Sequence, residues 1–160
     1  MGEVLRLIAG GLLAIVCSYV GVIVKKRYKA RAEFFAQAKE YFVFFEREMS
    51  YMKTPLPKIN EEFERTNVSG EFVKFLRGYF EGAKDKKEQY FLKKEEAERL
   101  RGALSGLGKS GYAEQQKYVA RWKEEMVQTA EKTAAENKKY GGMYFKLCVL
   151  LGIAIVIILA

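Results

Sequence analysis

The fold is decided by residues 44–57, FFEREMSYMKTPLP, in which a long aromatic helix runs into the only two prolines of the chain. A proline disfavours helical geometry in the residue before it and suits the first turn of a new helix. Thr54 precedes Pro55, and threonine is favourable as the capping residue of a helix N-terminus. The stretch therefore predicts an elbow, where one helix ends and Thr54 caps the next.

The helix before the elbow is predicted from its apolar spacing. Apolar residues recur in alternating steps of three and four, the spacing of a helix-packing seam. They are Phe35, Ala38, Phe42, Phe45, Met49 and Met52. Phe34, Tyr41, Phe44 and Tyr51 widen the seam to about half of the helix circumference. A helix with so wide an apolar arc is expected to contact several other helices.

Two glutamates of this helix point in different directions. Glu48 falls inside the apolar arc, whereas Glu46 projects to the other side and is expected on the surface. A carboxylate within an apolar arc costs several kcal/mol unless it is paired or hydrogen-bonded. Glu48 is therefore either a contact for a partner protein or an internal bond that fixes the register of the bundle.

Further helices are predicted after the elbow. The first begins near Leu56 and is closed by residues 67–70. Ser69 can cap the second helix, whose inward residues are Phe72, Val73, Leu76, Tyr79, Phe80 and Ala83. The chain is therefore expected to fold back on itself.

The second half of the chain continues the helical pattern. A polar loop is expected at residues 84–89, and a helix at residues 92–104. Ser110 can cap a last helix from Tyr112 onward. The seam of this last helix turns small and polar toward its end, which predicts a narrow two-helix neck. Its members are Gln115, Val119, Trp122, Met126, Thr129, Thr133 and Tyr140.

Apolar segments stand at both ends. Residues 7–24 carry no charge and, with flanking residues, match the length of a membrane-spanning helix. Residues 143–160 form the second apolar segment. We predict an all-α, membrane-anchored antiparallel helical bundle with a transmembrane helix at each end. Its predicted parts are an N-terminal transmembrane helix at 1–24, a helical bundle with its neck at 25–142 and a C-terminal transmembrane helix at 143–160.

The charge distribution orients these spans. The segment 25–31, KKRYKAR, holds five basic residues and no acid, although residues 32–139 are nearly balanced with 21 basic and 19 acidic residues. Basic residues beside an apolar span anchor to lipid headgroups and mark the cytoplasmic side. We therefore expect residues 25–142 in the cytoplasm and both termini across the membrane. The near-neutral body argues against nucleic-acid binding.

Small residues give the first span a face for close helix packing. Gly10, Ala14, Ser18 and Gly21 follow one another at spacings of four, four and three. Small residues at such spacings let helix backbones approach closely in membranes. Gly152 supplies a weaker counterpart in the second span.

Composition excludes several classes of function. The sequence has no histidine, the commonest general base, and a single aspartate, Asp85. Both cysteines, Cys17 and Cys148, fall in the apolar ends. The sequence GLGKSG at 106–111 imitates a phosphate-binding loop, but Ala103 replaces the glycine that such a loop needs. We expect no catalytic residue, no metal site and no cofactor.

Three stretches resemble the stage III sporulation protein AB family of endospore-forming bacteria, and the likeness covers nearly the whole chain. The stretches are Glu46-x-Glu48 with Tyr51 and Thr54-Pro55-Leu56; Leu107-Gly108 with Gln115-Gln116-Lys117; and Met143-Tyr144 with Leu147 and Gly152. The chain departs from the family pattern at Gly111, where an acidic residue is usual, and at Cys148, where a glycine is usual.

The resemblance implies a non-enzymatic platform in the channel complex between mother cell and forespore. The protein would lie in the mother-cell membrane facing the forespore. Its partners would be other stage III sporulation A proteins, including a cytoplasmic ATPase and envelope ring proteins. The cytoplasmic domain would be similar to inner-membrane platform proteins of type II secretion and type IV pilus machines. The expected partner-binding residues are Glu46, Glu48, Tyr51, Thr54 and Pro55.

Two other readings remain open. The chain is alternatively a generic membrane-tethered adaptor of another secretion or division system. As a membrane-bound enzyme it would have to work through Glu, Lys and Tyr side chains alone.

Overall fold

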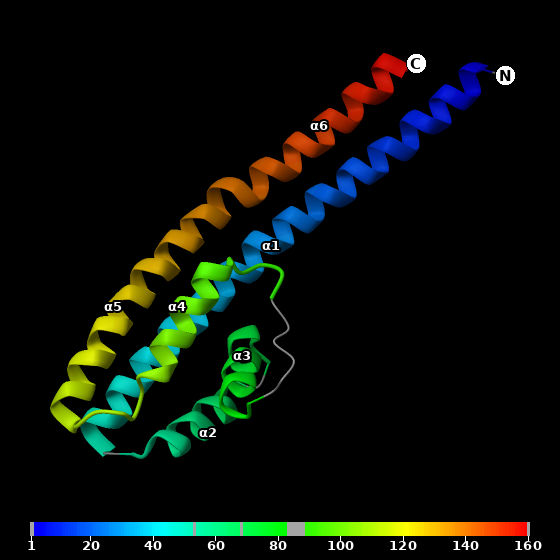
Figure 1. Cartoon of the computed structure of the whole chain (residues 1–160). Helices are drawn as coiled ribbons and strands as arrows, with labels where there is room; N and C mark the ends of the chain where they lie inside the picture. The colour runs from blue at the N-terminus through cyan, green and yellow to red at the C-terminus, as the bar shows by residue number, and fades with distance from the viewer. Residues whose placement is uncertain (1, 53, 68, 83–88, 160) are drawn as a thin grey trace. The chain divides into compact units, whose positions relative to one another are not determined.

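The computed structural model describes residues 2–52, 54–67, 69–82 and 89–159, and every regular element within these ranges is helical (Figure 1). The α-helices are α1 (Gly2–Met52), α2 (Leu56–Thr66), α3 (Glu71–Phe80), α4 (Lys94–Ser105), α5 (Tyr112–Glu136) and α6 (Gly142–Leu159). A single π-helical turn, η1 (Asn137–Gly141), joins α5 to α6. The all-α prediction is confirmed. The expected loop at 84–89 falls almost entirely outside the described residues.

The chain forms two compact units, and α1 contributes to both. One unit comprises Met1–Lys29 and Ala134–Ala160, and the other comprises Ala30–Thr133. We call them the apolar unit and the helical unit. Each is described separately below.

The helical unit is built around the second half of α1. Aromatic rings from several helices meet there: Phe34 of α1 contacts Phe72 and Phe75 of α3, and Tyr41 of α1 contacts Phe63 of α2. The ring centroids of these pairs lie 5.1 to 5.6 Å apart, a favourable distance for edge-to-face packing. The broad apolar arc of α1 therefore does contact several helices.

Polar bonds fix how the other helices pack on α1. Tyr41 donates a hydrogen bond to Asn60 Oδ1 of α2 at 2.7 Å. Arg31 makes a two-pronged ion pair with Glu96 of α4, at 2.5 and 3.2 Å, and its side chain is 9% exposed. Because both pairs are largely shielded from water, they set the register of α2 and α4 as well as adding stability.

The helix caps differ from those expected. Pro55 occupies the N-cap position of α2, and no side-chain capping bond involves Thr54. Gly70 rather than Ser69 is the N-cap of α3, and Gln37 Oε1 of α1 accepts a hydrogen bond from Phe72 N at 3.3 Å. The cap of α3 is thus supplied by another helix.

The cap predicted for the last helix is also displaced. Helix α5 begins at Tyr112, and Gln115 N donates to the carbonyl of Gly111 at 2.8 Å, so Gly111 holds the N-cap position. Ser110 Oγ donates to Gln115 Oε1 at 3.1 Å instead of to the helix backbone. Ser110, one residue before the N-cap, therefore stabilises the turn through its bond to the Gln115 side chain.

Two aromatic side chains expected to be inward are exposed. Tyr51 is 85% exposed, because α2 packs on α1 at Tyr41 and Phe44, two or more turns before it. Phe80 is the last residue of α3 and is 40% exposed. Both lie in the last turn of a helix.

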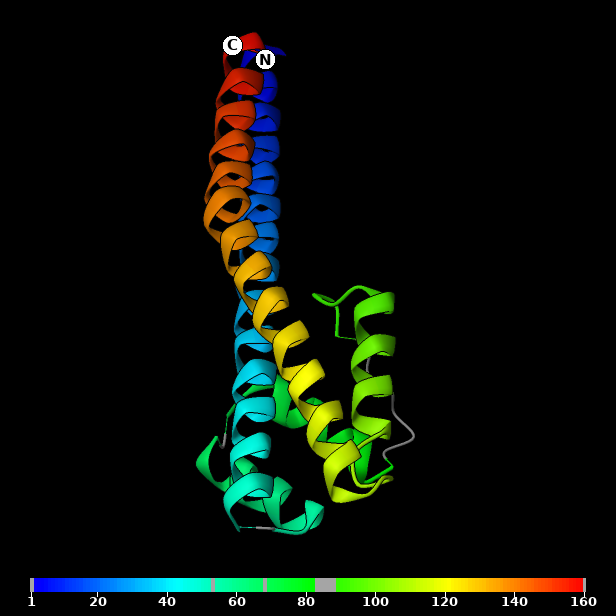
Figure 2. The ribbon, with the colours of Figure 1, turned by 90° about the vertical axis from the view of Figure 1, so that its left-hand side faces the viewer.

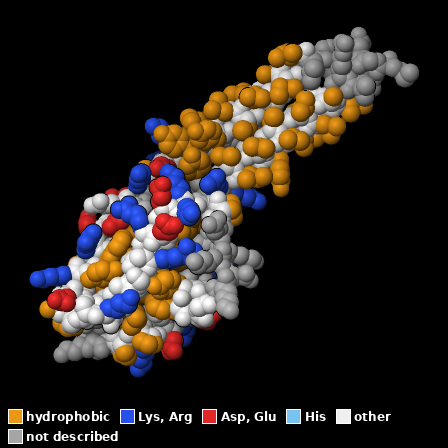
Figure 3. Space-filling view, viewed as in Figure 1, with side chains coloured by type: hydrophobic (Ala, Val, Ile, Leu, Met, Phe, Trp, Pro, Cys, Tyr) orange, Lys and Arg blue, Asp and Glu red, His pale blue; other side chains and the backbone are white. Residues whose placement is uncertain are grey.

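The apolar unit holds the two segments expected to span a membrane. The helices Ile8–Tyr51 and Tyr112–Ile158 are long and apolar enough to cross a bilayer, with mean hydropathies of 2.0 and 2.2 over their most apolar windows. Only 11% of each window is buried, unlike the core helix of a soluble protein. The N-terminal part of α1 and α6 run side by side (Figure 2). Apolar side chains predominate on the described part of their surface that Figure 3 shows.

Candidate functional site

Two residues of the elbow are exposed to solvent. Helix α1 ends at Met52 and α2 begins at Leu56, with Pro55 at φ −68° and ψ 147° between them. Pro55 is exposed and Thr54 is half-buried. Tyr51, 85% exposed, carries its ring into solvent on the last turn of α1.

Glu46 is not the free surface carboxylate that its spacing suggested. Lys123 Nζ of α5 lies 3.0 and 2.8 Å from its two carboxylate oxygens. The side chains of Glu46 and Lys123 are 28% and 32% exposed. The pair joins α1 to α5, so Glu46 holds the bundle together in this structure.

Glu48 is buried, as its position in the apolar arc requires. The residue is 9% exposed, and its carboxylate lies 3.5 Å from Arg47 Nε. Arg47 is itself exposed, and its guanidinium lies 5.1 Å from the centre of the Phe44 ring. The charge of Glu48 therefore has an internal counter-charge at the edge of the bundle.

Two distant stretches of sequence meet at this elbow. A Cβ placed on Gly108 would lie 3.3 Å from Leu56 Cδ2, so the turn between α4 and α5 packs closely on the start of α2. Gly108 has φ +76°, a conformation that favours glycine. Residues Lys109 and Gly111 of the same turn are exposed. The elbow and the α4–α5 turn thus form one continuous surface.

Gln115 is the polar residue that sequence reasoning undervalued. It was expected as a seam residue and as part of a family-like stretch, but not as a hydrogen-bonding centre. It is 5% exposed, and its Oε1 accepts hydrogen bonds from Gly108 N at 3.2 Å and from Ser110 Oγ. Because the Gly108 N–H can only donate, Oε1 must face it. The Gln115 Nε2 is then left buried without a partner among the described residues. A glutamine in an otherwise apolar seam was the available signal.

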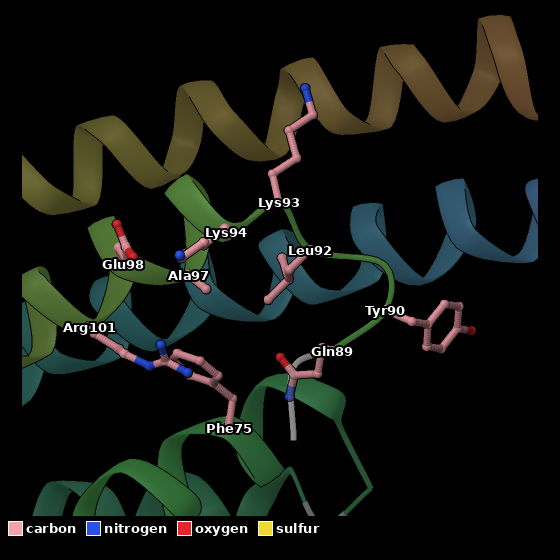
Figure 4. A pocket seen from close by; sticks show the side chains of 9 residues that line it. All are labelled: Phe75, Gln89, Tyr90, Leu92, Lys93, Lys94, Ala97, Glu98 and Arg101. Carbon is pink, nitrogen blue, oxygen red and sulfur yellow. The ribbon is translucent and has the colours of Figure 1, made fainter. Parts of the chain in front are cut away.

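A hollow lies between α3 and α4 (Figure 4). Its cavity volume is about 270 Å³, and Arg101 lies over the ring of Phe75 at 5.7 Å. Lys93, Lys94 and Glu98 line the same hollow, whereas Tyr90 points away from it in Figure 4. These side chains offer no arrangement of nucleophile and base.

The small residues of the first span lie against α6. Gly10, Gly21 and Gly152 are buried, and Ala14 and Ser18 are half-buried. A Cβ on Gly152 would lie 3.2 Å from Ala14 Cα, and one on Gly21 would lie 3.0 Å from the Cβ atom of residue 148. Cys148 of α6 therefore faces Gly21 of α1.

The described part of the chain shows no side-chain arrangement suited to binding a metal ion or to transferring protons. It holds no group of three or more His, Cys, Asp or Glu side chains that could bind a metal ion. Burial strongly raises the pKa of the Tyr41 hydroxyl, but its single hydrogen bond to Asn60 is structural.

These features define a class: an all-helical protein with two helices long and apolar enough to span a membrane, and a helical unit with an exposed elbow. The family model described as stage III sporulation protein AB matches residues 6–81 and 75–160. The chain belongs to this family. No match was found among curated proteins or among solved structures.

Family membership gives the chain a role in stage III of sporulation. Neither the family nor the helical fold indicates a catalytic activity.

Proposed function

We propose that the chain is a non-enzymatic membrane platform, a scaffold component of the secretion-like channel complex between mother cell and forespore. Residues 25–142 would lie in the mother-cell cytoplasm, because the basic segments flank the apolar ends on this side. The protein would connect a cytoplasmic ATPase to envelope-spanning ring proteins, as inner-membrane platform proteins of type II secretion machines do. This analogy rests on the sequence resemblance.

The observation that carries the proposal is the convergence at the elbow. Two of the three stretches that resemble the family meet there, through the contact of Gly108 with Leu56. Around them the chain exposes Tyr51 and Pro55. Residues required only for folding would be buried. The exposed tyrosine and proline lie beside the α4–α5 turn, which Gln115 stabilises, and this arrangement fits a surface that binds a partner protein.

Glu48→Ala tests this surface in sporulating cells. We expect the variant to lose co-purification of other stage III sporulation A proteins while the full-length protein keeps its helical content and melting behaviour. The lost carboxylate would release Arg47, which lies 3.5 Å away and reaches the surface. Glu40, an exposed glutamate of the same helix, supplies the control Glu40→Ala.

The outcomes separate structure from function. A variant that unfolds would make Glu48 a structural residue only. A folded variant that assembles and sporulates normally would contradict the role of the elbow. Turnover of a substrate by the purified protein would contradict the non-enzymatic assignment.

A further inference from the structure

A dense set of positive charges occupies one end of the apolar unit. Seven basic residues stand there against one acid, Glu136. All seven are exposed. We call them the basic collar: Lys25, Lys26, Arg27, Lys29, Lys138, Lys139 and Lys146.

The collar differs from the helical unit in how its charges are balanced. In the helical unit, Arg31, Arg77 and Arg99 each pair with a glutamate. In the collar, Lys26, Arg27, Lys138 and Lys146 have no carboxylate partner among the residues that the structure describes. Like charges gathered without counter-charges repel one another. A negatively charged ligand from outside the chain would balance the charge of these four residues.

Three tyrosines stand inside the collar. Tyr28 of α1 lies 6.2 Å from Tyr140 of η1 and 6.1 Å from Tyr144 of α6, measured between ring centroids. Tyr140 and Tyr144 are 6.1 Å apart. Their hydroxyls make no hydrogen bond to any described group. The cluster offers donors close to ammonium groups, the arrangement that a phosphate accepts.

The π-helical turn and its glycine bring these tyrosines together. A Cβ on Gly141 would lie 2.9 Å from Asn137 Oδ1 and 3.7 Å from Tyr28 Cβ, so η1 approaches α1 closely at this point. Single π-helical turns inside longer helices occur often at functional sites. Lys139 also lies over the Tyr140 ring, 5.1 Å from its centre.

The surface changes from basic to apolar within about one helical turn. Ile23, Met143 and Leu147 are 44%, 41% and 52% exposed, and each lies within four residues of a collar lysine. A ligand for the whole surface therefore needs a negatively charged head and an apolar tail. A free phosphate would contact only the basic part of this surface.

We propose that the basic collar and its three tyrosines bind anionic phospholipids of the membrane leaflet that surrounds the apolar unit. The phosphodiester of the headgroup accepts hydrogen bonds from basic side chains of the collar and from the tyrosine hydroxyls. The acyl chains lie along the exposed apolar residues beyond the collar. A zwitterionic lipid brings its own positive charge and is disfavoured. This inference does not rest on the partner role of the elbow.

The test uses the full-length protein in detergent micelles, titrated with phosphatidylglycerol or phosphatidylcholine and read by native mass spectrometry. We expect phosphatidylglycerol to bind more tightly, and more weakly as salt is added. Lys138→Gln with Lys139→Gln should weaken phosphatidylglycerol binding by about 30-fold, since each basic residue near an anionic surface contributes about 1 kcal/mol.

The matched control removes the same charge elsewhere. Lys94→Gln with Lys132→Gln changes two exposed lysines of the helical unit and should leave lipid binding unchanged. Equal binding of the two lipids, or an equal loss in the control, would overturn the proposal. Displacement of the lipid by free glycerol phosphate at the same concentration would also overturn it, because the site would then recognise a soluble phosphate.

Discussion

Tyr41 is the residue at which the core and its polar bonds meet. Its side chain has no exposed surface, its ring contacts Phe42, Phe63 and Phe72, and its hydroxyl donates to Asn60 Oδ1 at 2.7 Å. Burial disfavours the charged phenolate, which raises the pKa of Tyr41 well above its ordinary value of 10.0.

This pKa shift predicts a loss of stability at alkaline pH. Below pH 10, Tyr41 keeps its proton in both the folded and the unfolded chain, so its contribution to stability is complete. Above this pH the unfolded chain loses the proton and the folded chain does not, so the free energy of unfolding falls as pH rises. Melting temperatures of the full-length protein across this range measure the effect.

Tyr41→Phe is the matched variant for that measurement. At neutral pH it leaves the buried Asn60 amide without its partner and should cost about 1 to 3 kcal/mol. It should also lose less stability than the native protein as the pH rises above 10. Parallel alkaline curves for the two proteins would contradict the role of Tyr41.

At the scale of single residues, the spacing of the sequence predicted which side of a helix a residue lies on better than it predicted which residue it contacts. The helical repeat identified Glu48 as buried, because burial follows the face on which a residue stands. It could not show that Glu46 pairs with Lys123, since that contact depends on how α5 packs. Gln115 was missed as a bonding centre for the same reason: its partners lie in the turn before α5.

At the scale of elements, the turn between α4 and α5 contains the backbone conformation in the candidate site that most requires glycine, at Gly108. We expect Gly108→Ala to destabilise the protein by about 1 to 2 kcal/mol, because φ at this residue is +76° and an alanine there is strained. The added methyl group would also press on Leu56 at 3.3 Å. A melting curve of the full-length variant measures the loss.

Gly111→Ala is the control for that change. Gly111 lies three residues away in the same turn, and no heavy atom lies within 4 Å of the position its Cβ would take. It should therefore leave the melting temperature nearly unchanged. Equal effects at the two glycines would contradict the close packing of the turn on α2.

Helix boundaries show where local sequence is a sufficient guide. The elbow at Pro55 was predictable, because proline acts on the backbone next to it. The caps at Thr54 and Ser69 were not, because capping depends on what else is near. Helix α3 receives its capping bond from Gln37 of α1, a tertiary contact that a reading of neighbouring residues cannot find. The π-helical turn η1 likewise gave no local signal.

At the scale of the whole molecule, the placement of residues 25–142 in the cytoplasm stays a prediction. It can be tested with single cysteines introduced at exposed positions such as Lys58 and Lys117 in a variant without Cys17 and Cys148. A membrane-impermeant thiol reagent should label them only after the cells are opened. Labelling in intact cells would reverse the proposed topology.

All-helical class and apolar ends could be read from the sequence, because both depend on composition and periodicity spread over many residues. The association of Met1–Lys29 with Ala134–Ala160 in one unit could only be anticipated from small residues such as Gly21 and Gly152. The contact between the elbow and the α4–α5 turn could not be predicted from the sequence, because Leu56 and Gly108 are far apart in the chain.

In the function that we propose, the elbow is the contact surface of a sporulation platform. Its most direct test is a photo-reactive phenylalanine analogue placed at Tyr51 in sporulating cells, with the same analogue at Tyr90 as control. These tyrosines are 85% and 65% exposed, and both belong to the helical unit. We expect crosslinks to other stage III sporulation A proteins from the analogue at position 51 and none from the analogue at position 90. Crosslinks from Tyr90 alone, or none from Tyr51 in cells that complete sporulation, would contradict this proposal.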